Sequence, residues 1–86
     1  MASYELRFKR SVTKDLRRVP VQELERILGR VEALVDQPRP PGCEKIGSAN
    51  RYRIRQGAYR ILYEVDDVER VIMVYAVGHR RDVYRR

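Results

Sequence analysis

The chain has 86 residues, a length that fits one folded domain and leaves no room for two. Hydrophobic residues make up 43% of it, which is enough for the thin core of a two-layer domain, and charged residues make up 36%. Nineteen Lys and Arg against twelve Asp and Glu give a net charge of +7 at pH 7. We therefore expect a single domain over residues 1–86 with a polyanionic partner.

Arginine carries most of this charge, since only Lys9, Lys14 and Lys45 among the nineteen basic residues are lysine. Arginine presents a planar, bidentate fork that suits phosphate, and it stacks on bases. The alternative is that the charge merely keeps a small protein in solution. Solubility alone does not favour arginine over lysine, so the composition favours a nucleic-acid partner.

Three sequence features narrow the possible environments. The single Cys43 has no second cysteine for a disulfide, and no Cys or His lies near it at metal-ligand spacing. The N-terminal region is charged where a signal peptide would be apolar, and no stretch approaches the roughly 20 apolar residues of a membrane span. We expect a cytoplasmic protein with no metal, no cofactor and no membrane contact.

The first half of the chain predicts one short strand and two helices. Residues 4–8 alternate with period two, as a strand does. Ser11 is expected to cap a short helix over residues 11–18, before a proline. From Val21 to Val35, inward-facing apolar residues recur at the three-four spacing of an amphipathic helix. The prolines and glycine of residues 37–49 then predict a loop without regular structure.

The second half predicts three strands in a meander. Arg51–Arg55 alternates strictly, and residues 59–66 form the returning strand after a tight turn. Residues 69–77 are apolar on both faces, as in a central strand covered on both sides. A short basic turn or helix is expected from residue 78 onward. The order β-α-α-β-β-β predicts an α+β domain, in which a helical hairpin packs on one face of a small antiparallel sheet.

Strand alternation also predicts an arginine patch on the helix-free face of the sheet. If the tyrosine and isoleucine of residues 51–55 point toward the helices, the three arginines of that strand point away from them. Arg60 on the next strand turns to the same side, and no acidic residue lies between 51 and 60, so the patch is expected to be unneutralised and to suit phosphate. The alternative is a solvated face whose arginines pair with Glu64, Asp66 or Glu69. The four candidates are Arg51, Arg53, Arg55 and Arg60.

The basic segment after the last strand can fold back over the same face and adds further candidates. Tyr84 can stack on a base of single-stranded RNA, or it can instead close the edge of the core. His79 is the only side chain of this region that ordinarily titrates near neutral pH, although a lone histidine is more often structural. The candidates in this segment are His79, Arg80, Arg81, Tyr84, Arg85 and Arg86.

Three motifs of the second half resemble the RelE/ParE toxin superfamily of type II toxin–antitoxin systems. They are RYRIR at 51–55, AYRILY at 58–63 and VGHRRDVY at 77–84. The predicted first strand and helical hairpin extend the resemblance over essentially the whole chain. No phosphate-binding loop, nucleophile elbow, HExxH motif or carboxylate pair points to another class of enzyme.

The resemblance implies an endoribonuclease, an mRNA interferase that enters the ribosomal A site and cuts the bound message. In that family a 2′-hydroxyl attacks the adjacent phosphate and leaves a cyclic phosphate and a 5′-hydroxyl. A cognate antitoxin wraps the toxin in a hetero-oligomer and blocks it. We therefore expect Arg53, Arg60, Arg80, Tyr84 and His79 to be catalytic, and Arg51, Arg55, Arg81 and Arg85 to bind the substrate.

One departure from the family pattern concerns the general base. RelE carries lysines where this chain has Arg53 and Arg55, and the first of them is assigned as its base. Arginine keeps its proton to above about pH 12, so Arg53 is expected to stabilise the phosphorane instead. The base then stays unassigned, with His79 the only titratable candidate.

Two alternative functions are left open. The first is a ParE-like inhibitor of DNA gyrase without nuclease activity, and the second is a nucleic-acid-binding module without toxicity. The concentration of arginines together with Tyr84 favours the nuclease.

Overall fold

A computed structural model describes residues 3–47 and 49–83, and its elements follow the order β-α-α-β-β-β-β. The first three elements are β1 (Glu5–Phe8), α1 (Arg10–Arg17) and α2 (Val21–Ala33). Four strands follow, namely β2 (Glu44–Lys45), β3 (Arg51–Gln56), β4 (Tyr59–Asp66) and β5 (Val71–His79).

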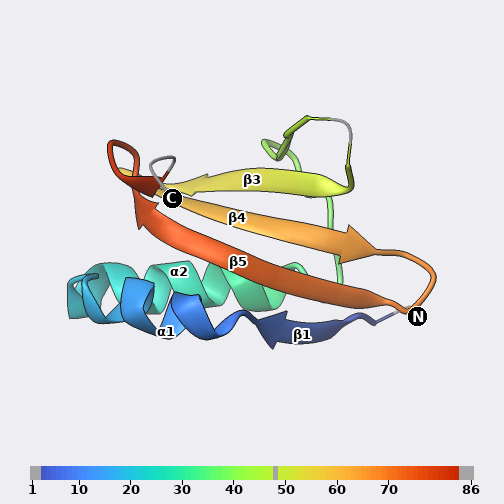
Figure 1. The fold of residues 1–86 in the computed structure, drawn as a ribbon, viewed down its shortest axis with the longest axis horizontal. Helices are drawn as coiled ribbons and strands as arrows, with labels where there is room; N and C mark the ends of the chain where they lie inside the picture. The colour runs from blue at the N-terminus through green and yellow to red at the C-terminus, as the bar shows by residue number, and fades with distance from the viewer. Residues whose placement is uncertain (1–2, 48, 84–86) are drawn as a thin grey trace.

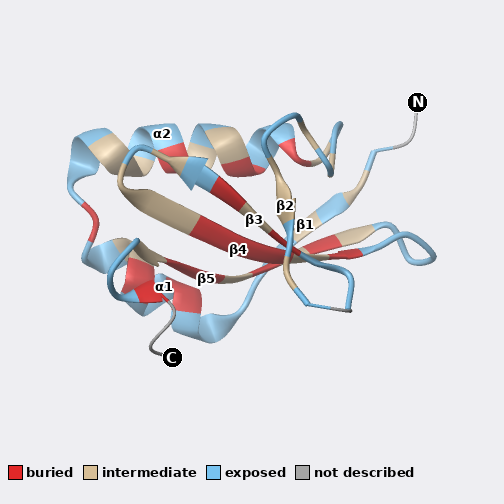
Figure 2. Cartoon of the chain, turned by 90° about the horizontal axis from the view of Figure 1, so that it is seen from above, coloured by how far each residue is buried: buried red, intermediate tan, exposed pale blue. Residues whose placement is uncertain are grey.

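The strands form one five-stranded sheet in the order β1-β5-β4-β3-β2 (Figure 1). Helix α2 covers one face of the sheet, and α1 lies at its edge beside β5 (Figure 2). The predicted α+β class is therefore confirmed. The pairs β3–β4 and β4–β5 are antiparallel, as predicted, and so is the pair of β3 with the unpredicted strand β2. Strand β1 instead pairs in parallel with β5. The sheet is therefore mixed rather than wholly antiparallel, because the chain leaves β1 through the two helices and returns along β5 in the same direction.

Three local expectations were wrong. The loop over residues 37–49 contains the short strand β2, which pairs with β3. Ser11 lies inside α1, where the N-cap residue is Lys9 and no side chain caps the helix. Val21 is 72% exposed because it begins α2 at the end of the helix that extends beyond the core.

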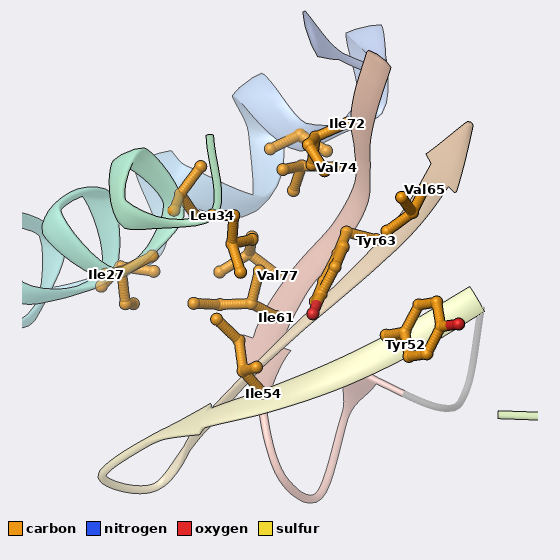
Figure 3. Packing of buried hydrophobic residues seen from close by; sticks show 13 residues of the cluster. Ile27, Leu34, Tyr52, Ile54, Ile61, Tyr63, Val65, Ile72, Val74 and Val77 are labelled. Carbon is orange, nitrogen blue, oxygen red and sulfur yellow. The ribbon is translucent and has the colours of Figure 1, made fainter. Parts of the chain in front are cut away.

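The main core lies between the sheet and the helices (Figure 3). Ile27 and Leu34 of α2 reach toward Ile54, Ile61 and Val77 of the sheet, as the predicted alternation of β3 and β4 requires. Figure 2 shows buried residues in the middle of β4 and β5 and exposed residues on the outer sides of both helices. The buried members of this core are Val12, Val19, Ile27, Val31, Leu34, Tyr52, Ile54, Ile61, Tyr63, Val65, Ile72, Val74 and Val77.

Asp15 of α1 is a buried carboxylate that completes the hydrogen bonding of β5. Strand β1 covers the edge of β5 only as far as the pair Phe8–Val74. Beyond that pair the helix α1 lies beside β5, and Asp15 accepts a hydrogen bond from the backbone N–H of Val77 at 2.9 Å. With 2% of its surface exposed, Asp15 is held where water cannot replace it.

We expect Asp15→Ala to lower the free energy of unfolding by about 1–3 kcal/mol, since it leaves the buried N–H of Val77 without this acceptor. Asp15→Asn, which keeps an acceptor oxygen of similar shape, should lose less. Urea denaturation of the three proteins provides the measurement. Equal stability of Asp15→Ala and the parent chain would show that the hydrogen bond contributes nothing.

Arg39, in the loop after α2, connects three distant parts of the fold. Its two Nη atoms donate to the carboxylate of Asp67 in the β4–β5 turn at 2.7 and 3.2 Å, and its Nε donates to the hydroxyl of Tyr52 at 2.9 Å. The hydroxyl of Tyr4 also donates to Asp67, at 2.7 Å. The hydrogen bonds from Arg39 and Tyr4 hold the pKa of the Asp67 carboxyl below its usual range.

A lowered pKa in the folded state means that the Asp67 carboxylate stabilises the fold above its unfolded pKa of about 4. That contribution is lost as the pH falls from this value through the lower folded pKa. We expect Asp67→Asn to melt below the parent chain at pH 7, and the difference to shrink below about pH 4. Asp36→Asn, at an exposed acid without an ion pair in the described residues, is the matched control and should melt close to the parent chain at pH 7.

Candidate functional site

The helix-free face of the sheet brings the four predicted strand arginines together. In the register of β3 against β4, Arg53 lies opposite Leu62 and Arg55 lies opposite Arg60. The residues that alternate with these arginines on β3 and β4 are buried beneath the helices, so the arginines point to the other side. Arg51 shares this face at the far end of β3.

The expectation that this patch is unneutralised was wrong. Glu44 on β2 accepts a hydrogen bond from Arg53 Nε at 3.2 Å, and it forms ion pairs with Arg53 Nη2 at 2.9 Å and Arg55 Nη2 at 3.3 Å. Glu64 accepts a hydrogen bond from Arg51 Nε at 3.0 Å. This is the pairing expected for Glu64 if the arginines form a solvated face. The missed strand β2 is the physical reason, because it places Glu44 directly opposite Arg53.

These contacts set the charge state of Glu44. The hydrogen bond from Arg53 and the positive charges of Arg53 and Arg55 hold the pKa of the Glu44 carboxyl below its usual range. The other two acids considered as arginine partners do not take that role. Asp66 accepts the backbone N–H groups of residues 68 and 69 in the β4–β5 turn, and Glu69 forms no ion pair with a described residue.

Arg60 is held by backbone oxygen rather than by a carboxylate. Its Nη1 donates to the carbonyl oxygens of Gly57 at 3.1 Å and Tyr59 at 3.0 Å, and it forms no ion pair within the described ranges. The residue opposite it on β5 is Gly78, which has no side chain to cover the guanidinium. Arg60 therefore keeps its full charge beside an open part of the face.

An apolar floor lies beside the arginines. Leu62, Ala76 and Val83 form a second buried cluster, with Ile46 and Tyr75 packed against it. A hollow of about 290 Å³ opens over this floor, and Lys9 and Ser11 also line it. The ring of Tyr75 lies between two cations, 5.9 Å from Lys9 Nζ and 5.1 Å from the guanidinium carbon of Arg51. Aromatic and apolar surface next to arginine is the arrangement on which unstacked bases bind.

The C-terminal segment folds back over the helix-free face, as predicted. The backbone N–H of Arg80 donates to the carbonyl of Ala58 at 2.8 Å, which ties the segment to the β3–β4 turn. Val83 then packs onto the apolar floor. Arg80 and Arg81 are exposed at this end of the sheet. Tyr84, Arg85 and Arg86 lie outside the described residues.

His79 is not brought together with the arginines. It pairs with Tyr59 on β4, which lies on the face toward the helices, and the two rings meet edge to face at 5.8 Å. Its Nδ1 accepts the backbone N–H of Arg81 at 3.3 Å. The ring is therefore held by Tyr59 and by the C-terminal segment, away from the arginines.

Residues Lys9, Tyr75 and Glu44 were not among the sequence-based candidates. A second basic surface was also missed, on α1 and at its two ends. This surface consists of the exposed side chains of Arg10, Lys14, Arg17 and Arg18. None of them forms an ion pair with a described residue. The sequence does carry a signal for this surface: four basic residues fall within residues 10–18, around the buried Asp15.

The described residues contain no group of three or more His, Cys, Asp or Glu that could hold a metal ion. Among the same residues, no helix is long and apolar enough to cross a membrane. The chemistry available on the helix-free face is therefore that of arginines, two paired carboxylates and an apolar floor.

Comparison with known proteins identifies the family. The family model described as the ParE toxin of the type II toxin–antitoxin system, parDE, matches residues 6–84. The chain belongs to the RelE/ParE toxin family. It is 34% identical over 91 residues to toxin RelG of Mycobacterium tuberculosis, a match that covers 96% of this chain and 98% of RelG.

Solved structures of RelE toxins share the fold. The isolated E. coli RelE toxin matches with a TM-score of 0.80 at 25% identity, over 90% of this chain and 84% of that one. A chain of the RelB–RelE antitoxin–toxin complex from Methanococcus jannaschii matches with a TM-score of 0.74 at 32% identity, over 92% of this chain and 95% of that one. The resemblance predicted from the sequence motifs is thus confirmed, and this family member is a toxin of the type II class.

Proposed function

We propose that this toxin is an endoribonuclease that cleaves mRNA in the ribosomal A site, through attack of a 2′-hydroxyl on the adjacent phosphate. The observation that carries the proposal is the arginine cluster on one open face of the sheet, beside an apolar and aromatic floor. Arginine forks bind phosphate oxygens, and the floor offers surface on which the flanking bases stack. Such an activity places the toxin in the cytoplasm with the ribosomes.

The chemistry of the reaction distributes roles among these residues. As the 2′-oxygen attacks, negative charge builds on the phosphorane oxygens, and fixed guanidinium groups stabilise that charge. We assign this role to Arg53, Arg60 and Arg80. Tyr84 is proposed to stack on a base at the cleavage site. The message backbone is proposed to bind at Arg51, Arg55, Arg81 and Arg85.

We assign His79 a structural role in this proposal, although an imidazole could also act as a general base. Its place on the opposite face and its hydrogen bond from the Arg81 backbone favour a part in holding the C-terminal segment. Through that segment it acts as a positioning residue for Arg80 and Arg81. A direct catalytic role of His79 remains the competing hypothesis, and the experiment on the general base described below separates the two.

The second candidate function is inhibition of DNA gyrase without nuclease activity. The description of the matching family model as a ParE toxin favours it. The RelE and RelG names of the similar proteins favour the nuclease, as does the arginine cluster. In vitro translation with mapped message ends, run beside a supercoiling assay, separates the two functions. Inactivity in both assays would instead indicate a binding module without toxicity.

We expect Arg53→Ala, Arg60→Ala and Arg80→Ala each to slow single-turnover cleavage on programmed ribosomes by about two to three decades, the loss of roughly 3–4 kcal/mol of transition-state stabilisation. Arg26→Ala, on the exposed side of α2, is the matched control and should cleave at the parent rate. Thermal unfolding should show that the variants stay folded, since exposed charges contribute little to stability. Full activity in all three variants would refute the assignment.

The proposed partner is a cognate antitoxin that forms a hetero-oligomer with this chain, as in the toxin–antitoxin complexes of its relatives. With a net charge of +7 on the toxin, we expect its toxin-binding segment to be acidic or amphipathic and to contact the arginine face. Affinity measured by calorimetry should fall as salt is raised from about 0.05 to 0.5 M, because salt screens exposed charge pairs. A basic binding segment whose affinity does not change with salt would contradict this expectation.

A further inference from the structure

The strongest unexplained feature of the arginine face is the position of Glu44. The two-residue strand β2 exists only along the edge of β3, and it places this carboxylate against Arg53 and Arg55. Its two oxygens make three contacts with guanidinium nitrogens between 2.9 and 3.3 Å, one a hydrogen bond from Arg53 Nε and two ion pairs. The side chain is nevertheless 41% exposed, so it faces the surface that the message would occupy.

We propose that Glu44 is the general base of the cleavage and accepts the proton of the attacking 2′-hydroxyl. The inference rests on the proposed nuclease function and deepens it, since the arginines assigned to that reaction cannot take the proton themselves.

The geometry of the reaction requires the base to lie beside the phosphate-binding groups. The 2′-oxygen and the phosphorus that it attacks belong to neighbouring positions and are only about 3 Å apart in a reactive conformation. A phosphate held by Arg53 therefore brings the 2′-hydroxyl close to any group within hydrogen-bond distance of Arg53. Glu44 meets this condition, with 2.9 Å between its Oε2 and Arg53 Nη2.

The other candidates do not meet this condition. Arginine does not release its proton in the neutral pH range. His79 lies on the opposite face of the sheet, with its Nδ1 engaged by a backbone N–H. Glu64 shares the face, but it pairs with Arg51 at the far end of β3.

The hydrogen bonds of Glu44 leave it able to act as a base. A carboxylate offers about four lone-pair directions, and the hydrogen bond from Arg53 Nε uses one of them. The charged groups that face it are Arg53 and Arg55, which keep it ionised at neutral pH. When a phosphate binds, it competes for the same guanidinium donors. Glu44 then loses part of this support, and its affinity for a proton rises at the moment of attack.

The proposed step balances as follows. The 2′-hydroxyl proton passes to a Glu44 oxygen while the bond between the 2′-oxygen and phosphorus forms. The bond from phosphorus to the 5′-oxygen breaks, and that oxygen leaves with the electron pair and takes a proton from solvent. Glu44 then returns its proton to solvent. The products are a 2′,3′-cyclic phosphate and a 5′-hydroxyl, with no net gain or loss of protons.

The test is single-turnover cleavage by Glu44→Gln on programmed ribosomes. The substitution keeps the size and an acceptor oxygen but removes the base, so we expect the rate constant to fall by about two to four decades. Affinity for the programmed ribosome should change little. Glu64→Gln is the matched control, because it neutralises a carboxylate of similar exposure on the same face, and it should cleave within a few-fold of the parent chain.

The pH dependence of the parent chain gives an independent test that needs no variant. The hydrogen bond from Arg53 and the charges of Arg53 and Arg55 hold the pKa of Glu44 below its usual range, so the carboxylate is ionised at neutral pH and the cleavage rate should be level from pH 5.5 to 8.5. A histidine base would instead make the rate rise between about pH 5.5 and 7.5. A rise of that kind that disappears in His79→Ala would overturn the inference and identify His79 as the base.

Other outcomes also decide the question. If Glu44→Gln cleaves within a few-fold of the parent chain, Glu44 is not the base. If it binds the ribosome more tightly and cleaves faster, Glu44 competes with the phosphate, and the inference is equally wrong. If the parent chain itself cleaves no message, the proposed function fails, and this result is distinct from an active parent with an active variant.

Discussion

The register of β3 against β4 is the constraint on which both faces of this protein depend. Side chains alternate along each strand, so a slip of one residue would move the arginines into the core and the apolar residues to the surface. The loop between the two strands is only Gly57 and Ala58, since Gln56 pairs with Tyr59. Gly57 has a φ of +59°, a left-handed conformation that a glycine adopts without strain in such a short hairpin loop. The stacked rings of Tyr52 and Tyr63, 5.8 Å apart, fix the same register from the core side.

A β-bulge between β4 and β5 decides what the helix-free face offers besides charge. Leu62 pairs with Ala76 while Tyr63 pairs with Val74, so Tyr75 is the extra residue of β5. Both Tyr75 and Ala76 therefore contribute to the apolar floor, and Val77 returns to the core. Without the bulge, strict alternation would place either Tyr75 or Ala76 on the helix side, and the apolar floor would lose that side chain.

The sequence could predict those parts of the fold that depend on short-range periodicity. The bounds of β4, the two helices and the common face of the four strand arginines all follow from alternation or from the three-four spacing. The parallel pairing of β1 with β5 and the hydrogen bond from Val77 to Asp15 join residues more than sixty positions apart, and no local pattern carries that information. The bulge is hidden for a different reason, because residues 71–77 are apolar on both sides of it.

The candidate site was only partly predictable for the same reason. Strand β5 was expected to end at Val77, which left His79 in a segment that could fold back over the arginine face. The strand continues through His79, so alternation places its ring opposite Tyr59 on the helix side. Glu44 was missed because a two-residue strand in a proline-rich loop has too few residues to show a period. Pairing with β3, and not a local preference, makes this segment a strand.

The arginine face also contains an unfavourable pairing of like charges that the fold itself does not require. Arg55 and Arg60 lie directly opposite each other on neighbouring strands, and like charges in that position destabilise a sheet. Glu44 partly offsets the charge of Arg55 through an ion pair, and the backbone carbonyl of Gly57 accepts a hydrogen bond from Arg60. A sequence optimised only for stability would replace one of the two arginines, so the opposed pair favours the proposed binding of a polyanion at this face. A bound phosphate would relieve the repulsion between Arg55 and Arg60, which means that the strain in the unliganded sheet contributes to the affinity of the face for its ligand.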